Sequence, residues 1–121
     1  DEQFYDADNI AILPMGFCYP GRAKSGDMPP RKECAPLWHK KLIGQMSIKY
    51  IFLIGQYAQT YYLKDKLSLT KRVENWQDYQ PNYFVLPHPS PRNNIWLKKN
   101  PWFEENVVPK IQSAVAPLVT P

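Results

Sequence analysis

The sequence predicts an α/β domain in which helices cover both faces of a short, mainly parallel sheet. Two uninterrupted apolar runs, Tyr50 to Ile54 and Tyr83 to Leu86, end at a glycine and at a proline. Continuous runs of this kind are typical of strands that are buried on both faces in a parallel sheet. The segments between and after them carry apolar side chains at helical spacing. This alternation favours a three-layer α/β/α sandwich.

A third strand is predicted near the start of the chain, from Ile10 to Met15, where nearly every residue is apolar and Gly16 ends the run. Residues 17–33 are rich in proline, glycine and basic side chains, which predicts a long loop of the kind that often carries function. A helix is predicted next, from Cys34 to Met46, because apolar residues recur there at helix-compatible spacing.

Three more helices are predicted from residue 56 onward. The first covers residues 56–63, and the second is capped near Thr70 and extends toward Tyr79. The third begins at Pro101, which suits the first turn of a helix. Pro109 falls inside the apolar stripe of this last helix, so a kink is expected there.

These elements predict a single domain over residues 1–121 that is N-terminally incomplete. The chain begins with Asp1 rather than Met, and the first predicted strand starts within about ten residues of it. Three strands also make a thin sheet, so we expect a further strand upstream.

Composition narrows the class of function only slightly. The net charge is +4, which permits a polyanionic partner without requiring one. No apolar run approaches the length that crosses a bilayer, and the N-terminus lacks the pattern of a signal peptide. We therefore expect a cytoplasmic protein that does not bind a membrane. We also expect a monomer, although nothing in the composition bears on the oligomeric state.

The segment from Leu86 to Asn94 is the strongest candidate for a functional site. His88 stands between two prolines at the end of an apolar run, and Ser90, Arg92 and Asn93 follow it. The prolines restrict the backbone, so this loop can hold one imidazole rigidly at the carboxyl edge of the sheet. The alternative is a stiff turn that carries a solvated histidine.

The two cysteines, Cys18 and Cys34, allow more than one interpretation. They can be unrelated thiols, and a disulfide is disfavoured in a reducing compartment. A metal or cluster site needs about four ligands. His39 lies beside Lys40 and Lys41, and we expect it to be solvated rather than to serve as a ligand.

Four stretches of the chain resemble the uracil-DNA glycosylase superfamily, especially its iron–sulfur branch (family 4). Residues 17–21, Phe-Cys-Tyr-Pro-Gly, are similar to that branch's segment Lys-Cys-Arg-Pro-Pro-Gly, and Cys34 falls where the branch has its next cluster cysteine. Residues 51–58 are similar to a strand-to-helix segment that ends Leu-Gly-x-x-Ala. Residues 88–93, His-Pro-Ser-Pro-Arg-Asn, resemble the second catalytic motif, in the form found in single-strand-selective monofunctional uracil glycosylases.

The resemblance implies hydrolysis of the N-glycosidic bond of uracil, or of a related deaminated base, in single- or double-stranded DNA. The target nucleotide would be flipped out of the stack. His88 would donate a hydrogen bond to the uracil O2 as negative charge builds there, an effect worth about 3–4 kcal/mol. Ser90 would bind a phosphate, and Arg92 with Asn93 would probe the groove. Further basic residues of the long loop would contact phosphates or remain solvated; they are Arg22, Lys24 and Arg31.

The resemblance also implies a [4Fe–4S] cluster of structural role, with Cys18 and Cys34 as two ligands and two further cysteines upstream. The superfamily's first motif is expected upstream as well, so the chain alone is expected to be inactive. Pro14 occupies the place of an Asn that recognises uracil, and proline has no side-chain amide to read a base. An alternative function is therefore a non-catalytic nucleic-acid-binding protein on the same scaffold.

Overall fold

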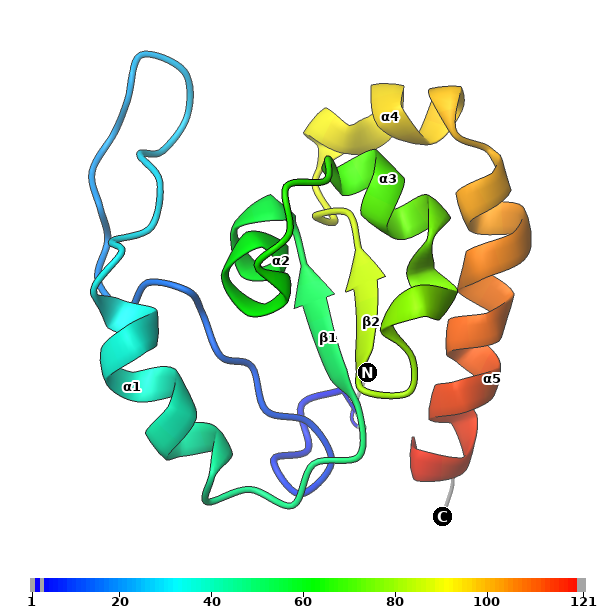
Figure 1. Cartoon of the computed structure of the whole chain (residues 1–121), viewed down its shortest axis with the longest axis horizontal. Coiled ribbons are helices and arrows are strands. Elements are labelled where there is room, and N and C mark those ends of the chain that lie inside the picture. Colours follow the sequence, from blue (N-terminus) through cyan, green and yellow to red (C-terminus); the bar gives the residue numbers. More distant parts are fainter. Residues whose placement is uncertain (1, 3, 120–121) are drawn as a thin grey trace. The chain divides into compact units, whose positions relative to one another are not determined.

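The computed structural model describes residues 2 and 4–119, which form two compact units (Figure 1). The smaller unit is Ile12–Lys49. The larger unit comprises Tyr50 onward together with the segment up to Ala11. The interpretation of the chain as a single domain stays a prediction. No helix in the described residues is long and apolar enough to cross a membrane.

The larger unit is built on a two-stranded parallel sheet, β1 (Ile51–Ile54) and β2 (Tyr83–Leu86). The register pairs the first residues of the two strands with each other and the last residues with each other, so both strands end at the same edge. Both strands were predicted, and β2 has the predicted bounds. The α/β class is confirmed.

Helices pack on both faces of this sheet. Helix α2 (Gln56–Leu63) lies on the Tyr83 face, because its Tyr62 ring contacts Tyr83 at a centroid distance of 6.2 Å. Alternate strand residues point to opposite faces. Phe84 therefore faces the other way, where Trp76 stacks on it at 6.5 Å.

The Phe84 face of the sheet is covered by the second half of the chain (Figure 1). Helix α3 (Leu69–Glu74) and the 3-10 helix η1 (Trp76–Tyr79) come first, where one capped helix was predicted. The terminal helix predicted from Pro101 is present as a π-helical segment, Phe103–Val107, and α5 (Val108–Val119). The core of this side consists of Val73, Phe103 and Val107.

The kink predicted at Pro109 stays a prediction, and the π-helical segment Phe103–Val107 directly precedes α5 there. Pro109 is the second residue of α5 and has no N–H to donate to the preceding turn. A widened π turn immediately before it is a recognised site of helix bending. Helix α4 (Asn94–Lys99), which precedes this region, was not predicted.

The smaller unit contains α1 (Cys34–Ile43), close to the predicted helix, and a turn closed by an antiparallel bridge between Arg22 and Asp27. The strand predicted from Ile10 to Met15 is wrong, because none of these residues is in a strand and Ile12 is 71% exposed. An apolar run becomes a strand only when another strand takes its backbone hydrogen bonds. The sheet therefore has two strands rather than three in the described residues.

Candidate active site

His88 lies at the edge where both strands of the sheet end. It follows β2 after Pro87, and Gly55 follows β1 directly. Gly55 has φ of +86°, and a Cβ built on it would lie 3.7 Å from Cβ and 3.8 Å from Cδ2 of His88. The exposed imidazole therefore packs beside the Gly55 backbone, in space that the glycine leaves open.

The backbone that leads to His88 is held by two hydrogen bonds to one carbonyl oxygen. The Leu86 oxygen accepts the Gly55 N–H at 2.9 Å and the Gln59 Nε2 at 2.9 Å. Both lone pairs of this oxygen are thus used. The next residue, Pro87, is buried and has a restricted φ. The chain therefore enters the His88 loop in one orientation.

The backbone that leaves His88 is held in the same way. The His88 carbonyl oxygen accepts the Ser90 N–H at 2.9 Å and a hydrogen bond from Asn93 Nδ2. Ser90 Oγ accepts the Arg92 N–H at 3.3 Å and caps the short 3-10 helix Pro91–Asn93. The structure thus brings the predicted site residues of this loop together, and the Arg92 side chain is exposed. Their roles in DNA binding stay predictions.

The start of α2 adds a favourable field for negative charge at this edge. Gly55 is its N-cap residue, and no side chain caps the helix. The backbone N–H groups of a first helical turn carry partial positive charge and attract anions. A donor imidazole beside such a terminus can stabilise an anion that develops within its reach.

The cysteines lie in the smaller unit and are not paired. Cys18 is exposed, and Cys34 is half-buried at the first residue of α1. No group of three or more His, Cys, Asp or Glu side chains that could hold a metal ion occurs in the described residues. A [4Fe–4S] cluster takes four thiolates. The described residues thus do not form the implied site by themselves, and the cluster stays a prediction.

The expectation that His39 is solvated is wrong. His39 is 2% exposed, and its Nε2 lies 2.7 Å from the Pro14 carbonyl oxygen. It shares the buried face of α1 with Ala35, one turn earlier, whereas the adjacent lysines are exposed. His39 therefore holds the segment containing Pro14 against α1 within the smaller unit.

Trp96 is partly buried and packs against the core of the larger unit. Its indole N–H donates to Thr70 Oγ1 at 2.8 Å, and its ring contacts Trp102 and Phe103. These contacts account for the residue without a ligand.

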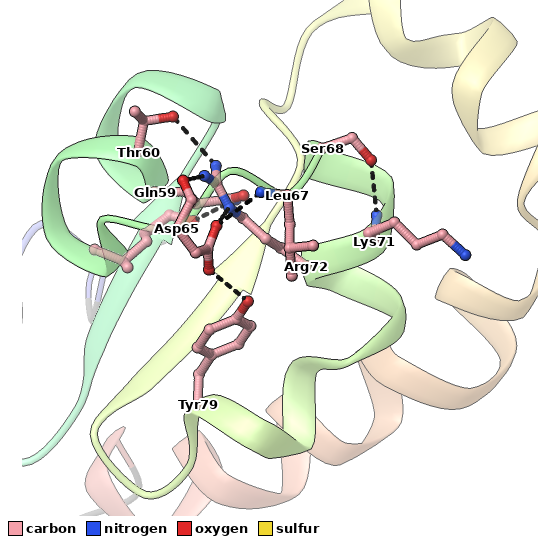
Figure 2. Close-up of polar contacts among 9 residues, drawn as sticks. Gln59, Thr60, Asp65, Leu67, Ser68, Lys71, Arg72 and Tyr79 are labelled. Atoms are coloured by element: carbon pink, nitrogen blue, oxygen red, sulfur yellow. Dashed lines mark hydrogen bonds and ion pairs between the residues drawn. The ribbon is translucent and has the colours of Figure 1, made fainter.

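Sequence reasoning missed a buried ionic cluster beside α2, shown in Figure 2. Arg72 is 2% exposed, and its Nε lies 2.8 Å from Asp65 Oδ1. Its Nη2 donates to the Asp65 carbonyl oxygen at 3.1 Å, and its Nη1 donates to Thr60 Oγ1 at 3.3 Å. The guanidinium therefore ties α3 to α2 and to the loop between them. In the sequence Arg72 resembles any solvated helix cation, so no local signal reveals it.

The carboxylate of Asp65 accepts from several donors. The Tyr79 hydroxyl donates to Oδ2 at 2.9 Å, and the Leu67 N–H donates to Oδ1 at 3.1 Å. Burial alone would raise the pKa of Asp65, but the hydrogen bonds from Arg72, Leu67 and Tyr79 outweigh it and hold that pKa below its usual value. Burial and the hydrogen bond to Asp65 raise the pKa of Tyr79.

The larger unit is thus an α/β scaffold that presents one exposed imidazole at the ends of parallel strands, on a backbone held by hydrogen bonds on both sides. In a comparison with known protein families, residues 1–112 match the Uracil DNA glycosylase superfamily. Because this match covers most of the chain, the chain belongs to that superfamily. Membership indicates a DNA glycosylase of DNA repair, a hydrolase whose substrate is DNA. The iron–sulfur branch and an incomplete N-terminus stay predictions.

Proposed function

We propose that the protein hydrolyses the N-glycosidic bond between deoxyribose and uracil, or a related deaminated base, in DNA, with His88 stabilising the departing base anion. The observation that supports this proposal is the pair of hydrogen bonds that holds the backbone on each side of His88, which fixes the point from which the exposed imidazole extends. The proposal requires the base to be flipped out of the stack toward this edge.

The chemical reason lies in where charge develops. As the glycosidic bond breaks, the base leaves as an anion whose negative charge resides partly on O2. A hydrogen-bond donor that is already in position lowers this barrier because it needs no reorganisation, and one such donor contributes about 3–4 kcal/mol. The N-terminus of α2 beside the imidazole favours the same charge.

The other predicted contacts concern DNA binding. Arg92 supplies an exposed cation two residues beyond Ser90. Both side chains can donate hydrogen bonds to phosphate oxygens or to groups in a DNA groove. Arg22, Lys24 and Arg31 are exposed cations of the smaller unit that suit phosphates.

An excision assay on the full-length gene product tests the proposal. A single-stranded oligonucleotide carries one uracil, and hot alkali cuts any abasic site. His88→Ala should lower the single-turnover rate about 10²–10³-fold, the equivalent of the donor's contribution. Gln112→Ala, an exposed change on α5, is the control and should excise as the wild type does. An unchanged rate in His88→Ala would refute the assigned role.

A second candidate function is non-catalytic binding of nucleic acid, which Pro14 favours. The Pro14 carbonyl oxygen accepts from His39, and the residue offers no side-chain amide to a base. A panel with uracil, hypoxanthine or xanthine in single- and double-stranded DNA separates the two functions. DNA binding without any abasic site would support this second candidate.

The iron–sulfur cluster is a separate proposal that rests on Cys18, Cys34 and two thiolates beyond the described residues. Iron analysis of the full-length gene product made anaerobically tests it. Iron that is lost in Cys18→Ala would support the cluster, and an iron-free wild type would exclude it.

A further inference from the structure

Gln59 is a fully buried polar side chain whose presence apolar packing does not explain. It lies in α2 with 0% exposure, and its Nε2 donates to the Leu53 oxygen at 3.2 Å and to the Leu86 oxygen at 2.9 Å. Its Oε1 is buried and has no hydrogen-bond partner in the described residues. A buried acceptor without a partner is destabilising, because folding removes its hydrogen bonds to water and supplies none in return. An apolar side chain of similar size would avoid this cost, so the amide needs another explanation.

The orientation of the amide is set by its two neighbours. Both are carbonyl oxygens, which only accept. A flipped amide would direct Oε1 at two other oxygens and lose both hydrogen bonds. The NH₂ group must therefore face the strand ends, and the unpaired Oε1 follows from that requirement. The Leu53 and Leu86 carbonyl oxygens thus each receive a hydrogen bond, while the Gln59 Oε1 receives none in the described residues.

The two acceptors belong to the adjacent strands at the edge that carries His88. Leu53 is the third residue of β1, and Leu86 is the last residue of β2. Gln59 thus bridges the two strands at the last pairs of the ladder, where Leu53 is in register with Val85 and Ile54 with Leu86. The Leu86 oxygen also accepts the Gly55 N–H, and the Gly55 backbone is what the imidazole packs beside.

We infer that Gln59 is a positioning residue for His88, which orients the Leu86–Pro87 peptide and so aims the imidazole without contact to the substrate. The inference rests on the proposed function of His88. Pro87 transmits the orientation, because its ring restricts φ and leaves little freedom between the Leu86 peptide and His88. Displacement of a catalytic group by about 1 Å can lower a rate about 10²-fold.

Gln59→Met tests this inference because it keeps the approximate volume of the side chain and removes the amide, and with it both donated hydrogen bonds and the unpaired Oε1. The single-turnover excision rate should fall about 10–100-fold while the Kd for DNA stays within about twofold of the wild type. Val73→Ala is the matched control, since it also destabilises the buried interior of the larger unit but lies outside the strand ends. Assays are run well below the melting temperature of each variant.

A double-mutant cycle separates positioning from general structural damage. If Gln59 acts through His88, Gln59→Met should cause no further loss of excision in the His88→Ala background. A loss that persists undiminished in that background would overturn the inference. So would a rate for Gln59→Met that falls no more than that of Val73→Ala.

The NMR signal of the His88 ring gives a readout that does not depend on catalysis. It is assigned as the ¹³C-histidine signal that disappears in His88→Ala. Gln59→Met should shift or broaden this signal, whereas Val73→Ala should leave it in place. An unshifted signal in Gln59→Met would overturn the positioning role. Normal excision by His88→Ala would instead refute the catalytic role proposed for His88, and the ring signal would still decide whether Gln59 orients His88.

Discussion

The ionic cluster around Arg72 predicts that its two charged members differ in how much their loss destabilises the protein. We compare Asp65→Asn, which removes the negative charge, with Arg72→Met, which removes the positive charge and keeps much of the apolar stem. The two changes break the same 2.8 Å ion pair. They leave behind different charges in different surroundings.

The exposure of each partner determines the expected magnitude. The Arg72 side chain is 2% exposed and that of Asp65 is 28% exposed. Asp65→Asn leaves a deeply buried cation without a counter-charge, which costs about 3–5 kcal/mol. After Arg72→Met, the Asp65 carboxylate keeps some water and two other donors, the Tyr79 hydroxyl and the Leu67 N–H. We therefore expect a smaller loss, about 2–3 kcal/mol.

Urea unfolding at pH 7, followed by tryptophan fluorescence, measures both free energies of unfolding. Repeating it in acid tests the cause. The folded pKa of Asp65 lies below its usual value of 3.8. The stabilisation that the ionised Asp65 carboxylate gives the folded protein is therefore fully present above pH 3.8. It is lost as the pH falls through the folded pKa. The difference between wild type and Asp65→Asn should therefore shrink as the pH is lowered below about 3.8.

The reverse order of the two losses would refute this reasoning, since it would mean that burial of the remaining charge does not set the cost. A difference between wild type and Asp65→Asn that is constant from pH 7 to pH 2 would refute the electrostatic origin. Tyr79→Phe is the control, because it removes one donor to Asp65 and leaves the ion pair in place.

Three further changes test other parts of the structure. Gly55→Ala meets no clash, since its Cβ would lie 3.7 Å from His88. Because φ is +86° there, the alanine should be strained and lower the free energy of unfolding by about 1–3 kcal/mol. Thermal unfolding measures this loss, and a wild-type melting temperature would contradict it. Ser68→Ala removes the side-chain cap of α3 and should cost about 1 kcal/mol in urea unfolding, whereas Ser68→Asp should be nearly neutral. His39→Leu leaves the Pro14 carbonyl oxygen without its imidazole donor and should cost about 1–3 kcal/mol in urea unfolding, while exposed Lys40→Ala should cost little. Equal stability of His39→Leu and the wild type would argue that the buried contact is dispensable.

Local sequence signals predict the elements around the site well, because a glycine or a proline marks where these elements end. Gly55 separates β1 from α2, and Pro87 ends β2, so the bounds of α2 and β2 agree with the prediction. The strand predicted from Ile10 to Met15 had an equally apolar sequence but no partner strand. Pairing is a property of the folded chain, so the apolar run could not reveal its absence.

The residues of the candidate site also differ in how well the sequence reveals them. The His88 loop is recognisable because its prolines, histidine and polar residues are contiguous. Gln59 and Arg72 are not recognisable, because a glutamine or an arginine within a helical pattern normally faces water. Their burial depends on which side of each helix the rest of the chain covers. His39 was misjudged for this reason, since its lysine neighbours point to solvent and it does not.

The buried polar residues of the larger unit contribute orientation, whereas its apolar core contributes stability. Contacts among residues such as Val73 and Phe103 are non-directional, so swaps that conserve volume alter them little. Hydrogen bonds depend on angle, and the groups that orient the His88 loop are of this kind. Arg72 supports the same region, because it bonds Thr60, the neighbour of Gln59 in α2. Changes to the apolar core should therefore affect stability more than excision, and removal of the Gln59 donor should affect excision more than stability.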